Sequence, residues 1–424
     1  MGFQQGLSGL NAAAKNLDVI GNNVSNANTV GFKASQAQFA DVYANAQGGT
    51  AGSSVGTGVR VAAIAQQFGQ GNISSTGNPL DMAISGQGFF QLSNNGAAVY
   101  SRNGQFQLDQ NGFIINAQGH MLTGYQVDPL TGLIATGSAG PIQIPQAAIT
   151  PLPTTTSQVG LNLDSRVTVP PTAIFNPADP TSYNNSTSMT IFDSLGNNHI
   201  ASMYFQKAAA PVNTWNAFMT VDGLPVNGVP TVPPSGTPLG TLTFSSTGLL
   251  ASTVPATAPL GTVTVPGGIT YANGSTTPQP MTMDFVTSTQ FGASFGVNTL
   301  NQNGYTSGQL NGFSASSDGT IMGHYTNGQS QPLGQVLLVN FVNAQGLQPL
   351  GNNEWSSTAA SGQPLVGTPG TASLGILQSG ATEDSNIDLT AELVNMITAQ
   401  RVYQANAQTI KAQDSIMQTI TNLR

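Results

Sequence analysis

The 424-residue chain contains no cysteine, and this absence removes several classes of protein at once. Disulfide scaffolds, thiol nucleophiles and cysteine-ligated zinc sites all need side chains that the chain lacks. Charge is also scarce, because Asp, Glu, Lys and Arg make up 6% of the residues, against about a quarter in an average soluble domain. Amides and hydroxyls therefore dominate the surface, and only weak long-range repulsion keeps copies of the chain apart.

The few cations are widely spaced, and none lies between Lys207 and Arg401. Nucleic-acid binding needs clustered Lys and Arg against phosphates, so we expect no nucleic-acid partner. No run of about 18 or more apolar residues is present, so we expect no insertion into a membrane. Residues 1–17 lack the charged start, apolar run and cleavage site of a secretory signal.

Catalytic chemistry also has little to build on. The three histidines, His120, His199 and His324, form no metal-ligand spacing, and we interpret each as a lone surface or turn residue. The acidic pair Glu383 and Asp384 precedes a predicted helix, where capping explains carboxylates. Nucleophile-elbow and phosphate-binding motifs are missing. We therefore expect no enzyme activity, no catalytic or cofactor-binding residues, no metal site and no cofactor.

Proline is missing from both ends of the chain. Most of the 25 prolines lie between Pro129 and Pro280, and none precedes Pro79 or follows Pro369. Long helices can therefore form at the termini, because proline is excluded from helix interiors. At the N-terminus, apolar steps of three and four residues predict a helix of about 22 residues with a heptad seam. The seam residues are Phe3, Leu7, Leu10, Leu17 and Val24.

A second heptad pattern predicts a helix of about 36 residues at the C-terminus. Ser385 followed by Asp388 matches a capping box at its start. Neither helix is stable alone, so we expect a coiled coil within one chain or between copies. The simpler alternative is two amphipathic helices packed on a globular core. The seam residues of the second helix are Leu389, Leu393, Met396, Tyr403, Ile410 and Met417.

Between the termini the pattern favours β-structure. Strand candidates such as 82–84 and 89–92 are punctuated by Asn95-Gly96, Asn103-Gly104 and similar pairs, which are strong hairpin signals. A glycine-rich tract at 48–58 predicts a flexible link.

We therefore predict a mixed, mainly β fold with nested β domains and long coiled-coil-forming α-helices at both termini. The predicted parts are a terminal helical domain (1–30 with 386–424), linking segments (31–70 with 362–385), a β-rich middle domain (71–150 with 304–361) and an inserted outer β domain (151–303).

Four blocks of the sequence resemble the family of flagellar rod, hook and hook-associated proteins. They are Ser25–Lys33, Leu80–Phe90, Tyr100–Phe106 and the closing run Asn386–Asn406. Four blocks in the family's order are a specific match, and a weaker one, Phe192–Asn197, resembles hook proteins in particular. The large inserted region favours a hook subunit over the shorter rod proteins. A distal rod or hook-filament junction protein is the alternative within the family.

The resemblance implies a non-enzymatic subunit of the bacterial flagellar hook that polymerises into a flexible helical tube. Such a tube acts as a universal joint that transmits torque from rod to filament. The implied partners are further copies of the chain, the distal rod, the hook cap, the hook-filament junction proteins and the flagellar type III export apparatus. The implied location is the extracellular hook and basal body, reached without a cleaved signal peptide.

The resemblance also assigns Asn26, Gly31 and Phe32 to the family motif at the junction between helix and link. A reading from a different class is a secreted β-rich adhesin. It explains the regions rich in Thr, Asn and Gly, but it does not explain heptads at both termini. A glycosidase with paired carboxylates is a third reading, and the scattered acidic residues do not favour it.

Overall fold

The computed structural model describes residues 2–42, 56–128, 131–226, 238–255 and 259–422. The chain divides into two compact units, one of residues 1–146, 312–324 and 330–424 and the other of residues 147–311 and 325–329. The second unit is therefore an insertion in the first, and the outer domain expected at 151–303 lies inside it. The division of the chain into the four predicted parts, with their bounds, stays a prediction.

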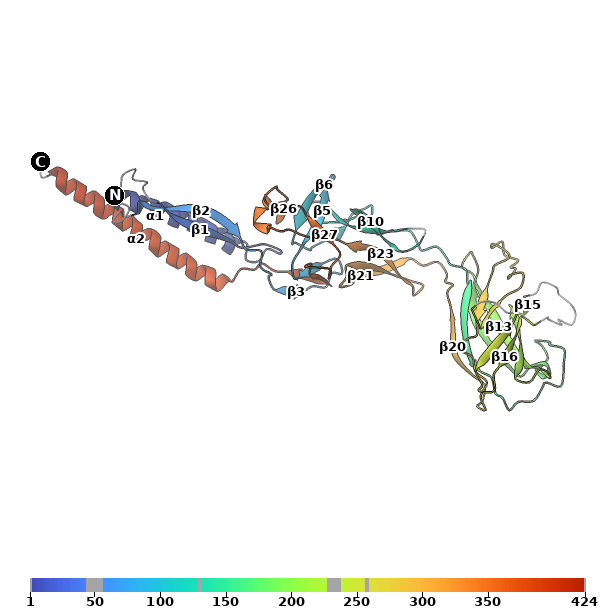
Figure 1. Ribbon diagram of the computed structural model, residues 1–424. Coiled ribbons are helices and arrows are strands. Elements are labelled where there is room, and N and C mark those ends of the chain that lie inside the picture. Colours follow the sequence, from blue (N-terminus) through green and yellow to red (C-terminus); the bar gives the residue numbers. More distant parts are fainter. Residues whose placement is uncertain (1, 43–55, 129–130, 227–237, 256–258, 423–424) are drawn as a thin grey trace. The chain divides into compact units, whose positions relative to one another are not determined.

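The first unit contains both long helices, α1 (Gly2–Ser25) and α2 (Leu389–Asn422). They lie side by side and run in opposite directions (Figure 1), with Gly6 near Ile410 and Asn23 near Glu392. The two heptad patterns thus produce two helices within a few residues of the expected lengths. Neither helix in the described part of the chain is long and apolar enough to cross a membrane.

Part of the expected link between 31 and 70 is a two-stranded sheet. Strand β1 (Ser35–Val42) pairs antiparallel with β2 (Gly58–Gln66), and both contact α1. β-branched and aromatic side chains such as Phe39, Val59 and Val61 favour this extended pairing over a flexible coil. Residues 48–55 of the glycine-rich tract lie outside the described residues.

A 13-stranded sheet forms the body of the first unit, with the principal strand order β21-β22-β23-β9-β5-β6-β26-β25. An aromatic core lies against it, where the rings of Phe89, Tyr100, Phe341 and Trp355 meet edge to face. The strands are β5 (Phe89–Asn94), β6 (Ala97–Ser101), β7 (Gln107–Leu108), β8 (Ile114–Ile115), β9 (Met121–Val127), β10 (Ile134–Pro141), β21 (Leu310–Ala315), β22 (Thr320–Tyr325), β23 (Ser330–Val336), β24 (Leu338–Asn340), β25 (Gln348–Gly351), β26 (Glu354–Ser356) and β27 (Leu365–Gly367).

Two small sheets join distant parts of the sequence at the base of the helices. Strand β3 (Ile73–Ser75) pairs with β29 (Ala381–Glu383), and β4 (Met82–Ser85) pairs with β28 (Ile376–Ser379). The segment that leads into α2 is therefore hydrogen-bonded to the segment that follows the hairpin β1–β2.

The Asn-Gly pairs have two different roles. Asn95 (φ 49°) and Gly96 (φ 92°) form the tight turn between β5 and β6, as the hairpin signal predicts. Asn103-Gly104 forms no hairpin turn. A Cβ at Gly104 would collide with the carbonyl oxygen of Met82, so this glycine is explained by close backbone approach.

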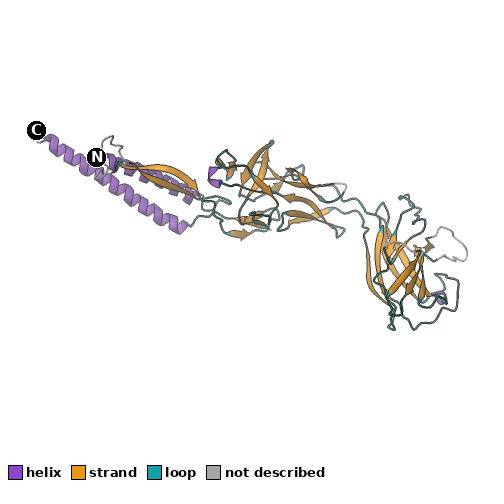
Figure 2. Ribbon diagram, viewed as in Figure 1, coloured by secondary structure: helices purple, strands orange, loops and turns teal. Residues whose placement is uncertain are grey.

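The second unit is a β domain with two sheets of its own (Figure 2). A six-stranded sheet and a four-stranded sheet, β18-β19-β11-β20, enclose a core that includes the fully buried Trp215, Phe205 and Phe285. The strands are β11 (Thr156–Asn162), β12 (Asn185–Phe192), β13 (Asn198–Lys207), β14 (Thr214–Val221), β15 (Leu224–Pro225), β16 (Gly240–Phe244), β17 (Leu250–Val254), β18 (Thr262–Thr264), β19 (Thr282–Asp284) and β20 (Gly296–Gln302).

Candidate assembly surfaces on the terminal helices

Helix α1 buries a face that is made of small residues in its first half and of larger ones in its second half. Its inner side, toward α2 and the hairpin β1–β2, carries Gly6, Ala12, Ala13, Val19, Ile20 and Asn23. The predicted seam lies largely on other sides of the helix. Phe3 is 52% exposed and Leu7 is 44% exposed, while Leu10, Leu17 and Val24 are half-buried. In a single chain, Phe3 and Leu7 therefore remain available to a partner, and the half-buried seam residues remain available in part.

Small residues let the two helices approach closely. A Cβ at Gly9 would fall 2.6 Å from the Asn406 Oδ1, and one at Gly6 would fall 3.1 Å from the Ile410 side chain. Asn406 also donates from Nδ2 to the carbonyl of Val402 in the preceding turn, which fixes its amide. At the N-terminal end of α1 the contact between the helices is thus two glycines against an amide and one apolar residue.

Helix α2 leaves most of its predicted seam exposed. Leu389 is 47% exposed, Leu393 44%, Tyr403 37% and Met417 63%. Met396 and Ile410 are half-buried, and Ala399 is the one fully buried apolar residue among the helix side chains that the structure describes. Further exposed apolar residues lie beside the seam, namely Val394, Ile397, Val402 and Ile416.

The start of α2 is capped by Asp388. Its carboxylate Oδ1 accepts hydrogen bonds from the backbone N–H groups of Thr390 (2.9 Å) and Ala391 (3.1 Å). The capping box expected at Ser385 is therefore wrong, because the helix begins at Leu389 and Ser385 is a buried residue of the preceding segment. A carboxylate at the N-terminus of a helix is also favoured by the helix dipole.

The motif after α1 holds the chain against the middle of the first unit. Asn26 donates from Nδ2 to the Asn22 carbonyl and accepts from the Thr29 hydroxyl, while the half-buried Phe32 donates its N–H to the Thr29 carbonyl. Gly31 adopts φ 71°, and a Cβ there would lie 2.6 Å from the backbone nitrogen of Asn103. Glycine is therefore required at this position both by conformation and by space.

Asn23 is a structural residue that the sequence analysis did not identify. Its side chain forms two hydrogen bonds with the backbone of Ser35, Nδ2 to O at 2.8 Å and Oδ1 from N at 2.9 Å, so it holds β1 against α1. The signal was a polar, turn-favouring residue inside a helical pattern, since Asn in a helix interior often has a partner outside the helix.

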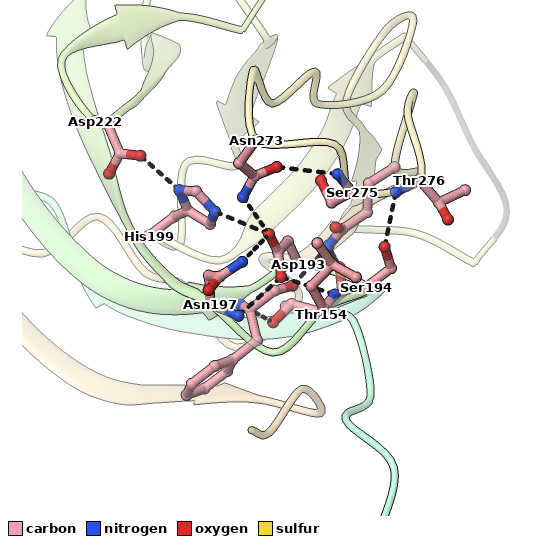
Figure 3. Close-up of polar contacts among 12 residues, drawn as sticks. Thr154, Asp193, Ser194, Asn197, His199, Asp222, Asn273, Ser275 and Thr276 are labelled. Carbon is pink, nitrogen blue, oxygen red and sulfur yellow. Dashed lines mark hydrogen bonds and ion pairs between the residues drawn. The ribbon is translucent and has the colours of Figure 1, made fainter. Parts of the chain in front are cut away.

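In the second unit, a polar cluster surrounds Asp193, as Figure 3 shows. His199 lies between two carboxylates, with Nδ1 2.6 Å from the Asp222 Oδ2 and Nε2 3.4 Å from the Asp193 Oδ2. Its ring stacks on the Tyr271 ring, with 4.2 Å between the ring centroids. The interpretation of His199 as a lone turn residue is therefore incomplete, because β13, the β14–β15 turn and the 271–273 loop meet at its ring.

Hydrogen bonds set the ionisation of Asp193. Burial by itself raises the pKa of this carboxyl, but donors from Asn197, Asn273 and His199 outweigh burial and hold the pKa well below its usual value. Burial also raises the pKa of Asp222, but hydrogen bonds from the His199 ring and the Ile200 N–H outweigh burial, so the pKa of this carboxyl is lowered as well. The ionised Asp193 carboxylate therefore holds the loop at Asn197 and the loop at Asn273 together. Among the described residues, no group of three or more His, Asp and Glu side chains is placed to hold a metal ion.

The other two histidines also have partners. His120 Nδ1 lies 2.9 Å from the buried Glu354, and His324 lies between the hydroxyls of Ser314 and Ser330. All three histidines thus take part in local polar networks of the β-structure.

Models of protein families match the chain in four places. The domain described as "Flagellar basal body protein FlaE D2 domain" matches 162–305, and "Flagellar hook protein FlgE/F/G D1 domain" matches 83–191. At the ends, "Flagella basal body rod protein" matches 3–33 and "Flagellar basal body rod FlgEFG protein C-terminal" matches 378–423. The matches at the ends cover the two terminal helices.

Comparison with individual proteins extends the similarity over the full length. The flagellar hook protein FlgE of Salmonella typhimurium is 45% identical, and that of Escherichia coli K12 is 44% identical, with 100% of each chain covered. The crystal structure of Helicobacter pylori flagellar hook protein FlgE2 shares the fold with a TM-score of 0.53 at 13% identity, over 73% of this chain and 100% of that one. The chain thus belongs to the family of flagellar hook proteins, the non-enzymatic structural subunits of the hook in the extracellular part of the flagellum.

Proposed function

We propose that the chain polymerises through the apolar rows that α1 and α2 leave exposed, and that the resulting helical tube is the flexible universal joint between rod and filament. The observation that carries this proposal is the exposure of the predicted seams. Phe3, Leu7, Leu389, Leu393 and Met417 are each more than two-fifths exposed on helices that otherwise belong to a folded unit. Isolated chains rarely leave such long apolar rows in water, and copies of the same helices are the natural cover.

The assembly residues in this proposal are those of the two seams and of the motif after α1. Covering the exposed half of one such side chain contributes about 0.7–1.5 kcal/mol, and a helical polymer repeats the gain at every subunit. The half-buried members, Leu10, Leu17, Val24, Met396 and Ile410, would border both the intrachain contact and the contact between copies, while Tyr403, 37% exposed, would lie in the contact between copies. Asn26, Gly31 and Phe32 would fix the position at which α1 ends and the chain turns into the hairpin β1–β2.

The remaining parts have different roles in this proposal. The terminal helical domain (1–30 with 386–424) lines the channel, the segments 31–70 and 362–385 connect it outward, and the middle (71–150 with 304–361) and outer (151–303) β domains form the outer wall. Contacts between amides and hydroxyls exchange partners without separating desolvated ions, so an outer wall with few charges bends more easily. Introducing Lys–Glu pairs across contacts of the outer domain should stiffen the tube, and unchanged bending stiffness would contradict this point.

The proposed partners besides further copies are the distal rod, the hook cap, the hook-filament junction proteins and the flagellar type III export apparatus. Support comes from the family membership and from the rod-protein models that match both termini. Each of these neighbours would meet the ends of a tube of this chain or deliver the chain to it.

Electron microscopy of seeded elongation tests the assembly. Full-length protein and a version trimmed to 31–385 are each added to short hook fragments, with the trimmed protein as the matched control for the β units. We expect tubes to lengthen with the full-length chain only, while circular dichroism shows the same β-structure in both. Elongation by the trimmed chain would place assembly in the β units and overturn the role of the helices.

A further inference from the structure

A buried cluster of three charges lies at the base of the terminal helices. Lys33 Nζ lies 2.7 Å from Glu383 Oε1, and Arg102 Nη1 lies 3.2 Å from Glu383 Oε2. The side chains of Lys33 and Glu383 are completely buried, and that of Arg102 is 4% exposed. The whole chain has nine Lys and Arg residues, and two of them lie in this one interior site.

Backbone groups complete the cluster. Lys33 also donates to the Gly69 carbonyl at 2.8 Å, and Glu383 Oε1 also accepts from the Gly71 N–H at 2.9 Å. Arg102 donates from Nη2 to the Gly86 carbonyl at 2.7 Å, and its guanidinium lies over the Phe89 ring at 5.7 Å. The Glu383 carboxylate is therefore shared by both cations.

The members of the cluster come from three distant places in the sequence. Lys33 lies between α1 and β1, Glu383 ends β29 just before α2, and Arg102 follows β6 of the main sheet. The Gly31 N–H adds a backbone hydrogen bond to the Glu383 carbonyl at 2.8 Å. One small interior site thus joins the end of α1, the approach to α2 and the main sheet of the first unit.

The electrostatics make these contacts hard to separate. Burial lowers the pKa of Lys33, the Glu383 carboxylate opposes this shift, and the Arg102 charge adds to it. Moving Glu383 away would leave two cations together in an interior that excludes water, and removing one partner of a buried ion pair is strongly unfavourable. Contacts between amides, hydroxyls or apolar groups at the surface carry no comparable penalty when they slide.

We propose that Lys33, Glu383 and Arg102 are positioning residues that keep the bases of both terminal helices fastened to the main sheet in every subunit of a bent hook. Bending then has to take place at contacts away from this cluster. The inference rests on the assembly proposed above, because only a curved polymer places its subunits in unequal environments.

Electron cryo-microscopy of a curved hook made from the unaltered chain tests the inference directly. Subunits on the inner and outer sides of the bend are reconstructed separately. We expect Lys33 and Glu383, and Glu383 and Arg102, to stay in contact in every subunit while contacts elsewhere differ around the circumference. Separation of either pair on one side of the bend would overturn the inference.

Two variants test the same point by seeded elongation. Glu383→Gln leaves both cations unpaired, and we expect its critical concentration to rise about 100-fold. Lys33→Met keeps the Glu383–Arg102 pair and the Gly31–Glu383 backbone hydrogen bond but removes the ion pair that ties the end of α1 to Glu383, so we expect it to elongate and to form hooks of lower bending stiffness. Lys15→Met is the matched control, because the Lys15–Asp18 pair is exposed and both side chains are more than three-fifths accessible.

The outcomes separate the two proposals. Glu383→Gln at the unaltered critical concentration, or Lys33→Met hooks as stiff as the control, would overturn the inference alone. Failure of the unaltered chain to elongate seeds would overturn the proposed assembly and the inference with it.

Discussion

Gly9 of α1 and Asn406 of α2 are packed so closely that a Cβ on Gly9 would lie 2.6 Å from the Asn406 Oδ1. This contact lies near the N-terminal end of α1, one turn from the contact of Gly6 with Ile410, and a methyl group there would require the Asn406 amide to move. Here the close approach of the two helices therefore depends on the smallest residues of α1, while Phe3 and Leu7 at the same end stay exposed.

Gly9→Ala should weaken the pairing of α1 and α2 by about 1 kcal/mol, because overpacking at the Asn406 amide exceeds the gain in helix propensity of about 0.5–1 kcal/mol. Gly21→Ala is the matched control, since nothing lies within 4 Å of a Cβ there. The control should stabilise α1 by about 0.5–1 kcal/mol through helix propensity alone. The temperature at which assembled tubes lose their helical circular dichroism measures the stability of both variants. Equal temperatures for Gly9→Ala and Gly21→Ala would show that the Gly9–Asn406 contact is not tight.

Leu393→Ser should raise the critical concentration for seeded elongation by about 3- to 10-fold, because covering the exposed part of this side chain by a neighbouring copy contributes about 0.7–1.3 kcal/mol. The thermal unfolding of the β units should not change, since Leu393 is 44% exposed in the single chain. Leu224→Ser, at a residue 68% exposed in the second unit, is the control and should elongate normally. Normal elongation by Leu393→Ser would remove this residue from the assembly surface.

Asp388→Ala should destabilise the start of α2 by about 1 kcal/mol, because the N–H groups of Thr390 and Ala391 lose their acceptor. Asp388→Asn should be close to neutral, since asparagine caps helices about as well as aspartate does. Hydrogen exchange at these two amides gives the measurement. Faster exchange in the alanine variant alone is expected, and unchanged exchange in both would show that the cap contributes nothing.

The second unit should lose stability as the pH falls below about 4. The folded-state pKa of Asp193 lies below its usual value, as does that of Asp222. At acid pH the unfolded chain therefore binds more protons than the folded chain, and the stability present at neutral pH is lost as the pH falls through the folded-state pKa.

Fluorescence of the buried Trp215 during urea unfolding reports this effect, with Trp355→Phe introduced so that one tryptophan remains. Asp193→Asn should be less stable at neutral pH and should show a shallower decline between about pH 5 and pH 2. A decline as steep as that of the parent would assign the acid sensitivity to other carboxyls.

The local turn chemistry was predictable where one residue pair decides it. Asn95-Gly96 makes its hairpin because both residues accept positive φ. Asn103-Gly104 has the same letters and makes none, because Gly104 is needed where the backbone of Met82 passes against it. The residue types of a dipeptide determine which backbone conformations are low in energy. The segment that packs against the dipeptide determines which of these conformations is adopted.

The terminal helices, the mainly β interior and the family resemblance followed from the sequence by itself, because proline placement, heptad spacing and Asn-Gly turns act over a few residues. Only the tertiary structure decided which face of each helix is used within one chain, since a heptad pattern counts large apolar residues and Gly6, Gly9 and Ala12 are small. The same holds for Lys33 and Glu383, which lie 350 positions apart. No local pattern foretells that two such distant charges share one interior site, because their pairing depends on the three-dimensional path of everything between them.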